Sequence, residues 1–280
     1  MRKRIGLWAL KLIGVLLFLW ILSSIDAQQL IRELATADKL LLTLSFPLVF
    51  LIYFCRTNRW KELVHAAGIT LPMQRHWEIM NVGIFLACIL PGKIGEMGKA
   101  AYLGAAGMRM ATALMITILD RVIDTVCVGL FAAAGVGILF GWQWSAYAIG
   151  CILLGAVIAL PFRKWLRNLL KDIALGSYTA ITLWTVCAWI MHFAWAITLA
   201  RAVGIETGLP ILVSVITFAG ILSLLPIAPS GLGTRDAALV LLLAPYGIPP
   251  EQAVALAFLM FVSIILSGFL GGWYWLKGVR

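Results

Sequence analysis

Charged residues are scarce in this chain of 280 residues, and their scarcity excludes an ordinary soluble domain. Asp, Glu, Lys and Arg together make up 12% of the sequence, whereas hydrophobic residues make up 62%. The apolar runs lack strand-like alternation, which excludes a membrane barrel. No loop is long enough to fold by itself. We therefore predict an all-α integral membrane protein in which residues 1–280 form a single membrane domain.

The residue groupings that carry familiar chemistries are also missing. The five cysteines contain no CxxC pair, so we expect neither a disulfide nor a metal site. We expect His65 and His76 to be solvated in a loop, and His192 to pack inside an aromatic-rich span. The chain has no Ser-His-Asp order, no Cys-His pair and no Walker loop. We therefore expect a protein that is not an enzyme and that needs no cofactor.

Acidic residues are outnumbered by basic ones, which gives a net charge of +10. The basic residues gather at the ends of apolar runs, which is the pattern of cytoplasmic loops rather than of a nucleic-acid surface. Arg56, Arg59 and Lys61 mark one such loop. We expect no nucleic-acid partner, a multi-pass topology and both termini in the cytoplasm.

Six apolar runs are long enough to cross a hydrocarbon core of about 30 Å. The first run follows a basic N-terminus and resembles a signal peptide, but its core is longer than usual, so we predict an uncleaved helix. The predicted spans are Ile5–Ser24, Lys39–Cys55, Met110–Phe140, Ser145–Pro161, Tyr178–Ala200 and Glu251–Leu276.

Two further apolar segments, at about 77–107 and 210–246, break before they could cross. Pro ends a half-helix and Gly permits a tight turn. We predict two re-entrant helical hairpins that enter from opposite faces, as an inverted repeat would produce. The break positions are Pro91, Gly92 and Gly95 in the first segment, and Pro226, Pro229, Gly231 and Gly233 in the second.

A half-helix that begins inside a membrane presents unpaired N–H groups and a positive dipole end, which favour an anion. Lys93 and Lys99 add positive charge near the first break, and Arg235 does so near the second. We predict a phosphate-bearing ligand there; the alternative is that these cations pair with nearby carboxylates. Glu96 and Asp236 follow the breaks, where they would cap a half-helix, balance the cations or exchange protons.

Three more charges, Asp120, Arg121 and Asp124, lie within the span at 110–140. The two aspartates are four residues apart and therefore face one side of the helix, while Arg121 can reach Asp124. Charges at this depth face a bundle interior and are functional candidates. The alternative is that the aspartates only hold the arginine.

Together these motifs resemble the lysylphosphatidylglycerol synthase transmembrane-region family, which includes the flippase half of the bacterial multiple peptide resistance factor. Asp236 stands where that family usually has Glu. The resemblance implies lipid translocation in a bacterial cytoplasmic (inner) membrane, with aminoacyl phospholipids or polyprenyl-phosphate-linked sugars as substrates. The runs that carry it are Leu90–Glu96 with Lys99, Asp120–Asp124 and Pro226–Asp236.

We therefore expect a flippase or scramblase for a lipid with an anionic, phosphate-containing headgroup. Two alternatives stay open. One is a lipid-binding accessory protein that does not translocate lipid, with a membrane glycosyltransferase or lipid synthase as its partner. The other is an integral-membrane enzyme that modifies lipid headgroups, with acid–base chemistry from carboxylates such as Glu96. Assembly into a homo-oligomer is also left open.

Overall fold

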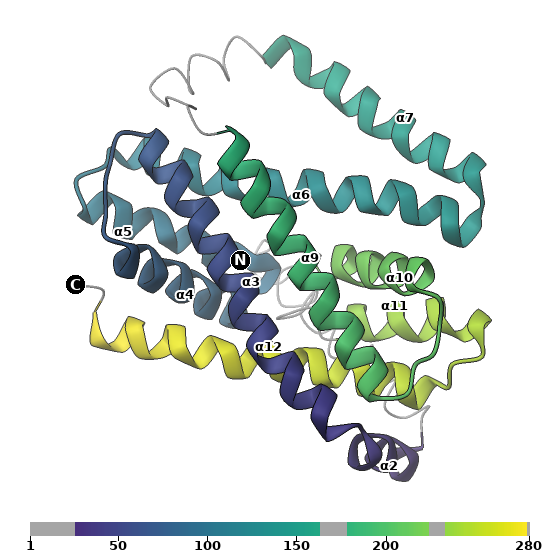
Figure 1. Ribbon diagram of the computed structural model, residues 1–280. Coiled ribbons are helices and arrows are strands. Elements are labelled where there is room, and N and C mark those ends of the chain that lie inside the picture. The colour runs from purple at the N-terminus through teal and green to yellow at the C-terminus, as the bar shows by residue number, and fades with distance from the viewer. Residues whose placement is uncertain (1–25, 163–177, 224–232, 279–280) are drawn as a thin grey trace, which may run out of the picture.

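The computed structural model describes residues 26–162, 178–223 and 233–278, and every regular element in these ranges is a helix (Figure 1). The predicted first span, and the break residues Pro226, Pro229 and Gly231, lie outside the described residues. The elements in chain order are α2 (Ala27–Thr36), α3 (Lys39–Ala66), α4 (Met73–Ile89), η1 (Pro91–Gly98), α5 (Lys99–Ala105), α6 (Met110–Phe140), α7 (Trp142–Ala159), η2 (Leu160–Phe162), α9 (Tyr178–Ala202), α10 (Leu209–Leu222), α11 (Thr234–Leu243), η4 (Ala244–Tyr246) and α12 (Pro250–Lys277).

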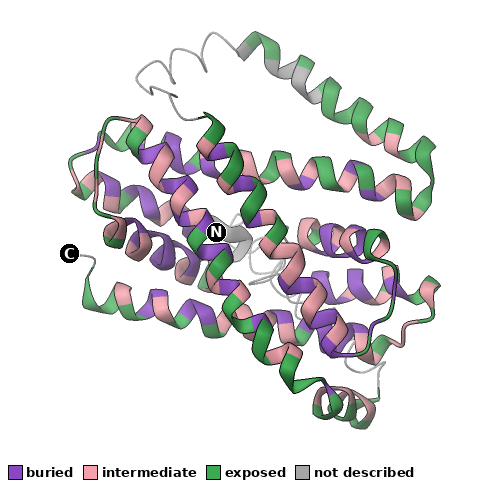
Figure 2. Ribbon diagram, in the orientation of Figure 1, coloured by how far each residue is buried: buried purple, intermediate pink, exposed green. Residues whose placement is uncertain are grey.

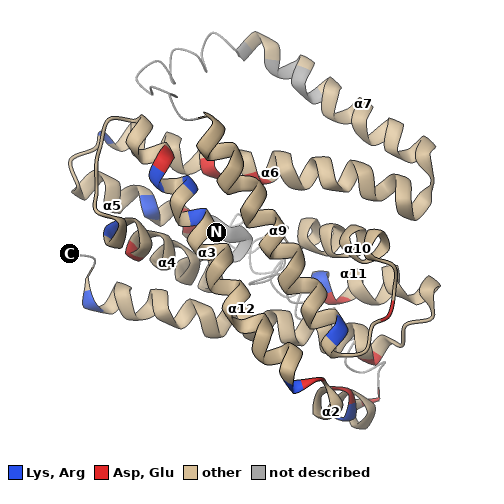
Figure 3. Ribbon diagram, in the orientation of Figure 1, with Lys and Arg blue, Asp and Glu red and all other residues tan. Residues whose placement is uncertain are grey.

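Four of these helices, α3, α6, α9 and α12, are long and apolar enough to cross a membrane. Figure 3 shows that charged residues are absent from long stretches of α6, α7 and α12. The prediction of an all-α, multi-pass membrane protein is therefore confirmed, and α6 has the predicted limits. The total of six crossings stays a prediction.

Aspartates begin the first two described helices. The Asp26 carboxylate accepts a hydrogen bond from the Gln28 N–H (2.8 Å), and Asp38 accepts one from Leu40 (2.8 Å). Such N-caps satisfy backbone donors that lack a partner within the helix. The Asp38 N–H also donates to the Ala202 carbonyl (2.8 Å), which ties the start of α3 to the end of α9. These two helices then pack along each other (Figure 1).

Glycines let α12 approach α4 closely. A Cβ atom added at Gly271 would lie 2.0 Å from the Asn81 carbonyl oxygen, and one at Gly268 would lie 3.2 Å from the Cys88 sulfur. Small residues allow this kind of close backbone contact between membrane helices. The buried residues in Figure 2 lie where α3, α4, α9, α10, α11 and α12 face one another, whereas α7 packs along α6 and is mostly exposed.

The chain folds back on itself after α4. Leu90 ends the helix in an extended conformation, and η1 then packs against α4. A Cβ at Gly95 would lie 2.2 Å from both the carbonyl carbon and the oxygen of Leu86, so only glycine fits there. This reversal is what a re-entrant hairpin requires. Its position in the membrane stays a prediction.

A second helical pair, α10 and α11, packs together on another side of the bundle (Figure 1). Gly233 immediately precedes α11 with a φ of 82°, which favours glycine. α10 also packs against α6, where a Cβ at Gly135 would lie 3.1 Å from the Ser214 side chain.

The predicted loop after Cys55 is wrong. α3 continues to Ala66, so the basic residues assigned to that loop lie on the helix, and Arg59 is fully buried. His76 is also buried rather than solvated. Burial, helped by the charge of Lys61, lowers the pKa of His76 to about 4.

Candidate functional site

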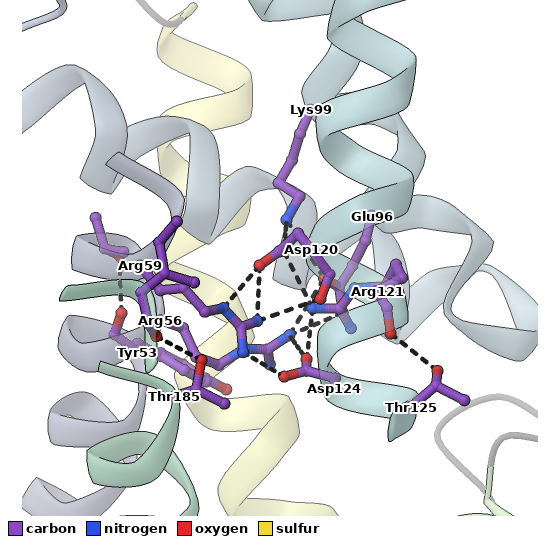
Figure 4. A network of polar contacts seen from close by, with 12 residues as sticks. Tyr53, Arg56, Arg59, Glu96, Lys99, Asp120, Arg121, Asp124, Thr125 and Thr185 are labelled. Carbon is purple, nitrogen blue, oxygen red and sulfur yellow. Dashed lines mark hydrogen bonds and ion pairs between the residues drawn. The ribbon is translucent and has the colours of Figure 1, made fainter. Parts of the chain in front are cut away.

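Charged side chains from four elements meet inside the bundle (Figure 4). α6 contributes two aspartates one helical turn apart and the arginine between them, and α3 contributes two arginines. The chain reversal after α4 brings in one glutamate and one lysine. The members of this charge network are Arg56 and Arg59 on α3, Glu96 on η1, Lys99 on α5, and Asp120, Arg121 and Asp124 on α6.

The inner half of the network is sealed from solvent. Arg59, Lys99 and Asp120 have side chains that are 0% exposed. Arg59 donates to the Asp120 carboxylate from Nε (3.0 Å) and Nη2 (2.7 Å), and to Asp124 from Nη1 (2.6 Å). The Lys99 ammonium donates to the other Asp120 oxygen (2.7 Å). Charges buried this deeply require such partners, because desolvation otherwise costs several kcal/mol or more.

The surroundings of Lys99 explain why it points inward. Its aliphatic stem lies over Gly83 of α4, where a Cβ would come within 2.8 Å of Lys99 Cγ. Its ammonium lies 4.2 Å from the centroid of a Trp60 ring, which is a cation–π distance. Glu96 is a further 3.6 Å contact. Lys99 is thus held entirely by protein groups, as in the pairing alternative that the sequence left open.

The outer half of the network is partly accessible. The side chains of Arg56, Arg121 and Asp124 are 17%, 19% and 23% exposed. Arg121 contacts Glu96 at 2.9 Å and Asp124 at 2.8 Å. Arg56 contacts the same two carboxylates at 3.3 and 3.2 Å. A polar ligand could therefore reach these side chains without displacing the buried half.

A second polar site lies at the start of α11. The Arg235 side chain is buried, and its Nη2 donates to the Ala257 carbonyl on α12 (2.9 Å), while its Nε has no acceptor. Asp236 interacts electrostatically with Arg235 but forms no salt bridge with it; its carboxylate instead accepts a hydrogen bond from the Gly233 N–H (2.6 Å) and caps the helix. Among the described side chains, Arg235 forms no salt bridge.

The structure brings together five of the predicted site residues: Glu96, Lys99, Asp120, Arg121 and Asp124. No described contact joins them to Arg235 or Asp236. The break residues Pro91 and Gly92 and the predicted cation Lys93 lie in η1, but the side chains of Pro91 and Lys93 are outside the described part of the structure.

Sequence reasoning missed Arg56 and Arg59. They are spaced three residues apart and complement the two aspartates of α6, which is the signal that could have identified them. Across the residues that the structure describes, no group of His, Cys, Asp and Glu has an arrangement suited to a metal ion.

The long apolar helices and the interacting charges between them define a multi-pass helical membrane protein with a charged interior. The chain belongs to the lysylphosphatidylglycerol synthase transmembrane-region family, which matches residues 7–272. It is also similar to a UPF0104 membrane protein of Methanocaldococcus jannaschii, at 23% identity over 312 residues that cover 94% of this chain and 92% of that relative. No solved structure matches significantly. The family resemblance predicted from the motifs is confirmed.

Proposed function

We propose that this protein moves a lipid with a phosphate-containing headgroup across the membrane. Membership in the family supports a role that involves lipid. Aminoacyl phospholipids and polyprenyl-phosphate-linked sugars are the substrate classes that we consider first. The membrane that we propose is the bacterial cytoplasmic membrane, with both termini on the cytoplasmic side. The role is transport rather than headgroup chemistry.

The observation that carries this proposal is the state of Arg235. Its guanidinium is buried and donates one described hydrogen bond, to the Ala257 carbonyl, while its Nε–H has no acceptor. The described residues give this guanidinium no salt-bridge partner, although Asp236 is close enough to interact with its charge. Burying a cation without such a partner is costly, so a site of this kind is suited to a negatively charged ligand. Arg is also the side chain that best matches the geometry of phosphate oxygens. A lipid phosphate satisfies both requirements while its tails stay in the bilayer.

The helical pairs provide a way for a headgroup to reach this depth. α4 has 17 residues and α10 has 14, which correspond to about 26 and 21 Å of helix, short of a core of about 30 Å. We propose that α4 with η1 and α5 forms one re-entrant hairpin, and α10 with α11 the other, entering from opposite faces. Irregular backbone at such depth is tolerated where it lines a protein interior or a wet cavity. Opening of one hairpin at a time would expose the site to one leaflet and then to the other.

Reconstitution into liposomes tests the proposal. Wild-type protein should transfer fluorescent phosphate-bearing lipids between leaflets faster than empty vesicles do. Arg235→Gln should abolish most of the excess rate yet leave the protein folded, because it removes the desolvation cost of a buried cation while the Gln amide can still donate to the Ala257 carbonyl. Arg32→Gln, which changes an exposed arginine on α2, is the matched control. Equal rates for wild-type protein and empty vesicles would contradict the proposal.

The same samples separate the alternatives. A lipid that is chemically altered after incubation would instead identify a headgroup-modifying enzyme. Binding of phosphate lipid without transfer, together with co-purification of a glycosyltransferase or lipid synthase, would identify an accessory protein.

A further inference from the structure

The charge network carries one positive charge in excess, and the geometry assigns that excess to Arg56. The described side chains of the network include four cations and three carboxylates. Arg59, Lys99 and Arg121 supply every contact of 2.9 Å or less to those carboxylates. The contacts of Arg56 are longer, at 3.2 and 3.3 Å. The carboxylates would therefore keep their main partners without Arg56.

Arg56 also uses only part of its guanidinium. A single nitrogen, Nη2, makes both of its carboxylate contacts, to Glu96 and Asp124. Its Nε is buried without an acceptor, and so is the Nε of Arg121 on the neighbouring helix. Two arginines of the partly accessible half of the network thus hold N–H donors for which the described residues supply no acceptor. A buried donor without a partner destabilises the folded protein, and an incoming acceptor would remove that cost.

This edge is the accessible one. The Arg56 side chain is 17% exposed and that of Asp124 is 23% exposed, whereas Arg59 behind them is 0% exposed. Figure 4 shows that Arg56 and Arg59 reach the network from the same side, and both contact Asp124. A ligand that approaches this edge meets the surplus cation before it meets the sealed pairs.

We infer that the accessible edge of the network binds one oxyanion of the phosphate class, with Arg56 as its principal donor and Arg121 as the second. One oxyanion there would neutralise the surplus positive charge, and its oxygens would accept hydrogen bonds from the Nε–H groups of Arg56 and Arg121. The phosphate could belong to a lipid headgroup or be free phosphate. For the lipid source, the inference rests on the proposed function, to which it adds a second binding position besides Arg235. A lipid headgroup would then move between two binding positions, one at Arg235 and one at Arg56.

Glu96 should oppose binding of the oxyanion. Its carboxylate occupies Nη2 of Arg56 and Nη1 of Arg121, so it competes with the incoming oxyanion. Neutralising it should strengthen phosphate binding, whereas neutralising Arg56 should weaken it. A purely structural network would not respond with opposite signs.

Calorimetric titration of the full chain in detergent tests this inference. The probes are inorganic phosphate and the short-chain lipid dihexanoyl phosphatidic acid, with dihexanoylglycerol as the uncharged comparison. Relative to wild type, Arg56→Gln should weaken binding of the phosphate probes roughly tenfold or more, and Glu96→Gln should strengthen it by a similar factor. Arg56→Lys should retain part of the affinity, and Arg32→Gln on α2 should change nothing.

Each outcome is decisive. Binding of both phosphate probes supports an oxyanion site open to small anions, and binding of the lipid probe alone supports a headgroup site. No binding by wild-type protein, or unchanged affinity in Arg56→Gln, overturns the inference. If that variant does not fold, Arg56→Lys and Glu96→Gln carry the test through their opposite shifts. Lipid transfer could be lost in Arg235→Gln while phosphate affinity is unchanged in Arg56→Gln. That result would refute the second binding position and leave the proposed function intact.

Discussion

Replacing Asp120 by Asn should destabilise the protein more than any change to the accessible edge of the network. The Asp120 carboxylate contacts Arg59 and Lys99 at 2.7 Å each and Arg121 at 3.3 Å, and two of these three cations have no exposed side-chain surface. The amide keeps the shape but not the charge. Arg59 retains Asp124, whereas Lys99 retains only its 3.6 Å contact with Glu96 and the Trp60 ring.

The expected loss follows from the partners left behind. Removing one member of a buried, hydrogen-bonded ion pair costs about 3–5 kcal/mol. For a protein of this size, such a loss lowers the thermal midpoint by roughly 6–12 °C. Thermal unfolding in detergent, followed by intrinsic tryptophan fluorescence, measures it. Glu78→Gln is the matched control, because Glu78 accepts a bond from Gln74 (2.9 Å) at an exposed position, and it should change stability by less than about 0.5 kcal/mol.

A double variant tests the cause. In Asp120→Asn with Lys99→Met, the ammonium that lost its partner is gone. The double variant should therefore lose about 1–3 kcal/mol less free energy of unfolding than the sum of the two single variants. Midpoints for Asp120→Asn within 2 °C of wild type, or strictly additive effects in the double variant, would refute the reasoning about buried charge.

Two further predictions concern the fold around this network. Gly95→Ala should lower the free energy of unfolding by about 1–3 kcal/mol or more, because its Cβ would meet backbone atoms of Leu86 at 2.2 Å. Gly98→Ala should be milder, because its Cβ would meet only the flexible end of the Leu86 side chain at 2.7 Å. Equal thermal midpoints for the two variants would contradict this. Because the folded-state pKa of His76 is lowered to about 4, stability should be complete above about pH 6.5 and fall by up to about 3 kcal/mol as the pH drops toward 4. Thermal midpoints measured from pH 7.5 to 5 should fall more steeply in wild type than in His76→Gln, and parallel slopes would count against the assignment.

Much of the helix layout could be predicted from the sequence because apolar runs and glycines act locally. The run at 110–140 is uninterrupted and ends at Gly141, whose φ of 102° stops the helix, so its limits were predicted correctly. The second span was not, because a basic cluster after an apolar run looks the same whether the helix ends or continues. What extends α3 is the pairing of Arg59 with Asp120 and Asp124, which are distant in sequence.

The sequence could predict which residues form the candidate site better than it could predict what each residue contacts. Glu96, Lys99 and the charges of α6 were identified because charges at membrane depth are costly and therefore informative. Sequence alone could not decide whether Lys99 faces a ligand or a carboxylate. Its contact with Trp60 and its stem over Gly83 are set by the packing of α3, α4 and α5, which no local pattern encodes.

The central claim is that the buried guanidinium of Arg235 receives its missing negative charge from a lipid phosphate. The most direct test is an electron cryomicroscopy structure of the full chain in nanodiscs that contain an anionic phospholipid. The account predicts headgroup density within hydrogen-bonding distance of Arg235, beside the start of α11. A structure in which Arg235 pairs with a carboxylate of the chain itself, with lipid density confined to the outer surface, would contradict it.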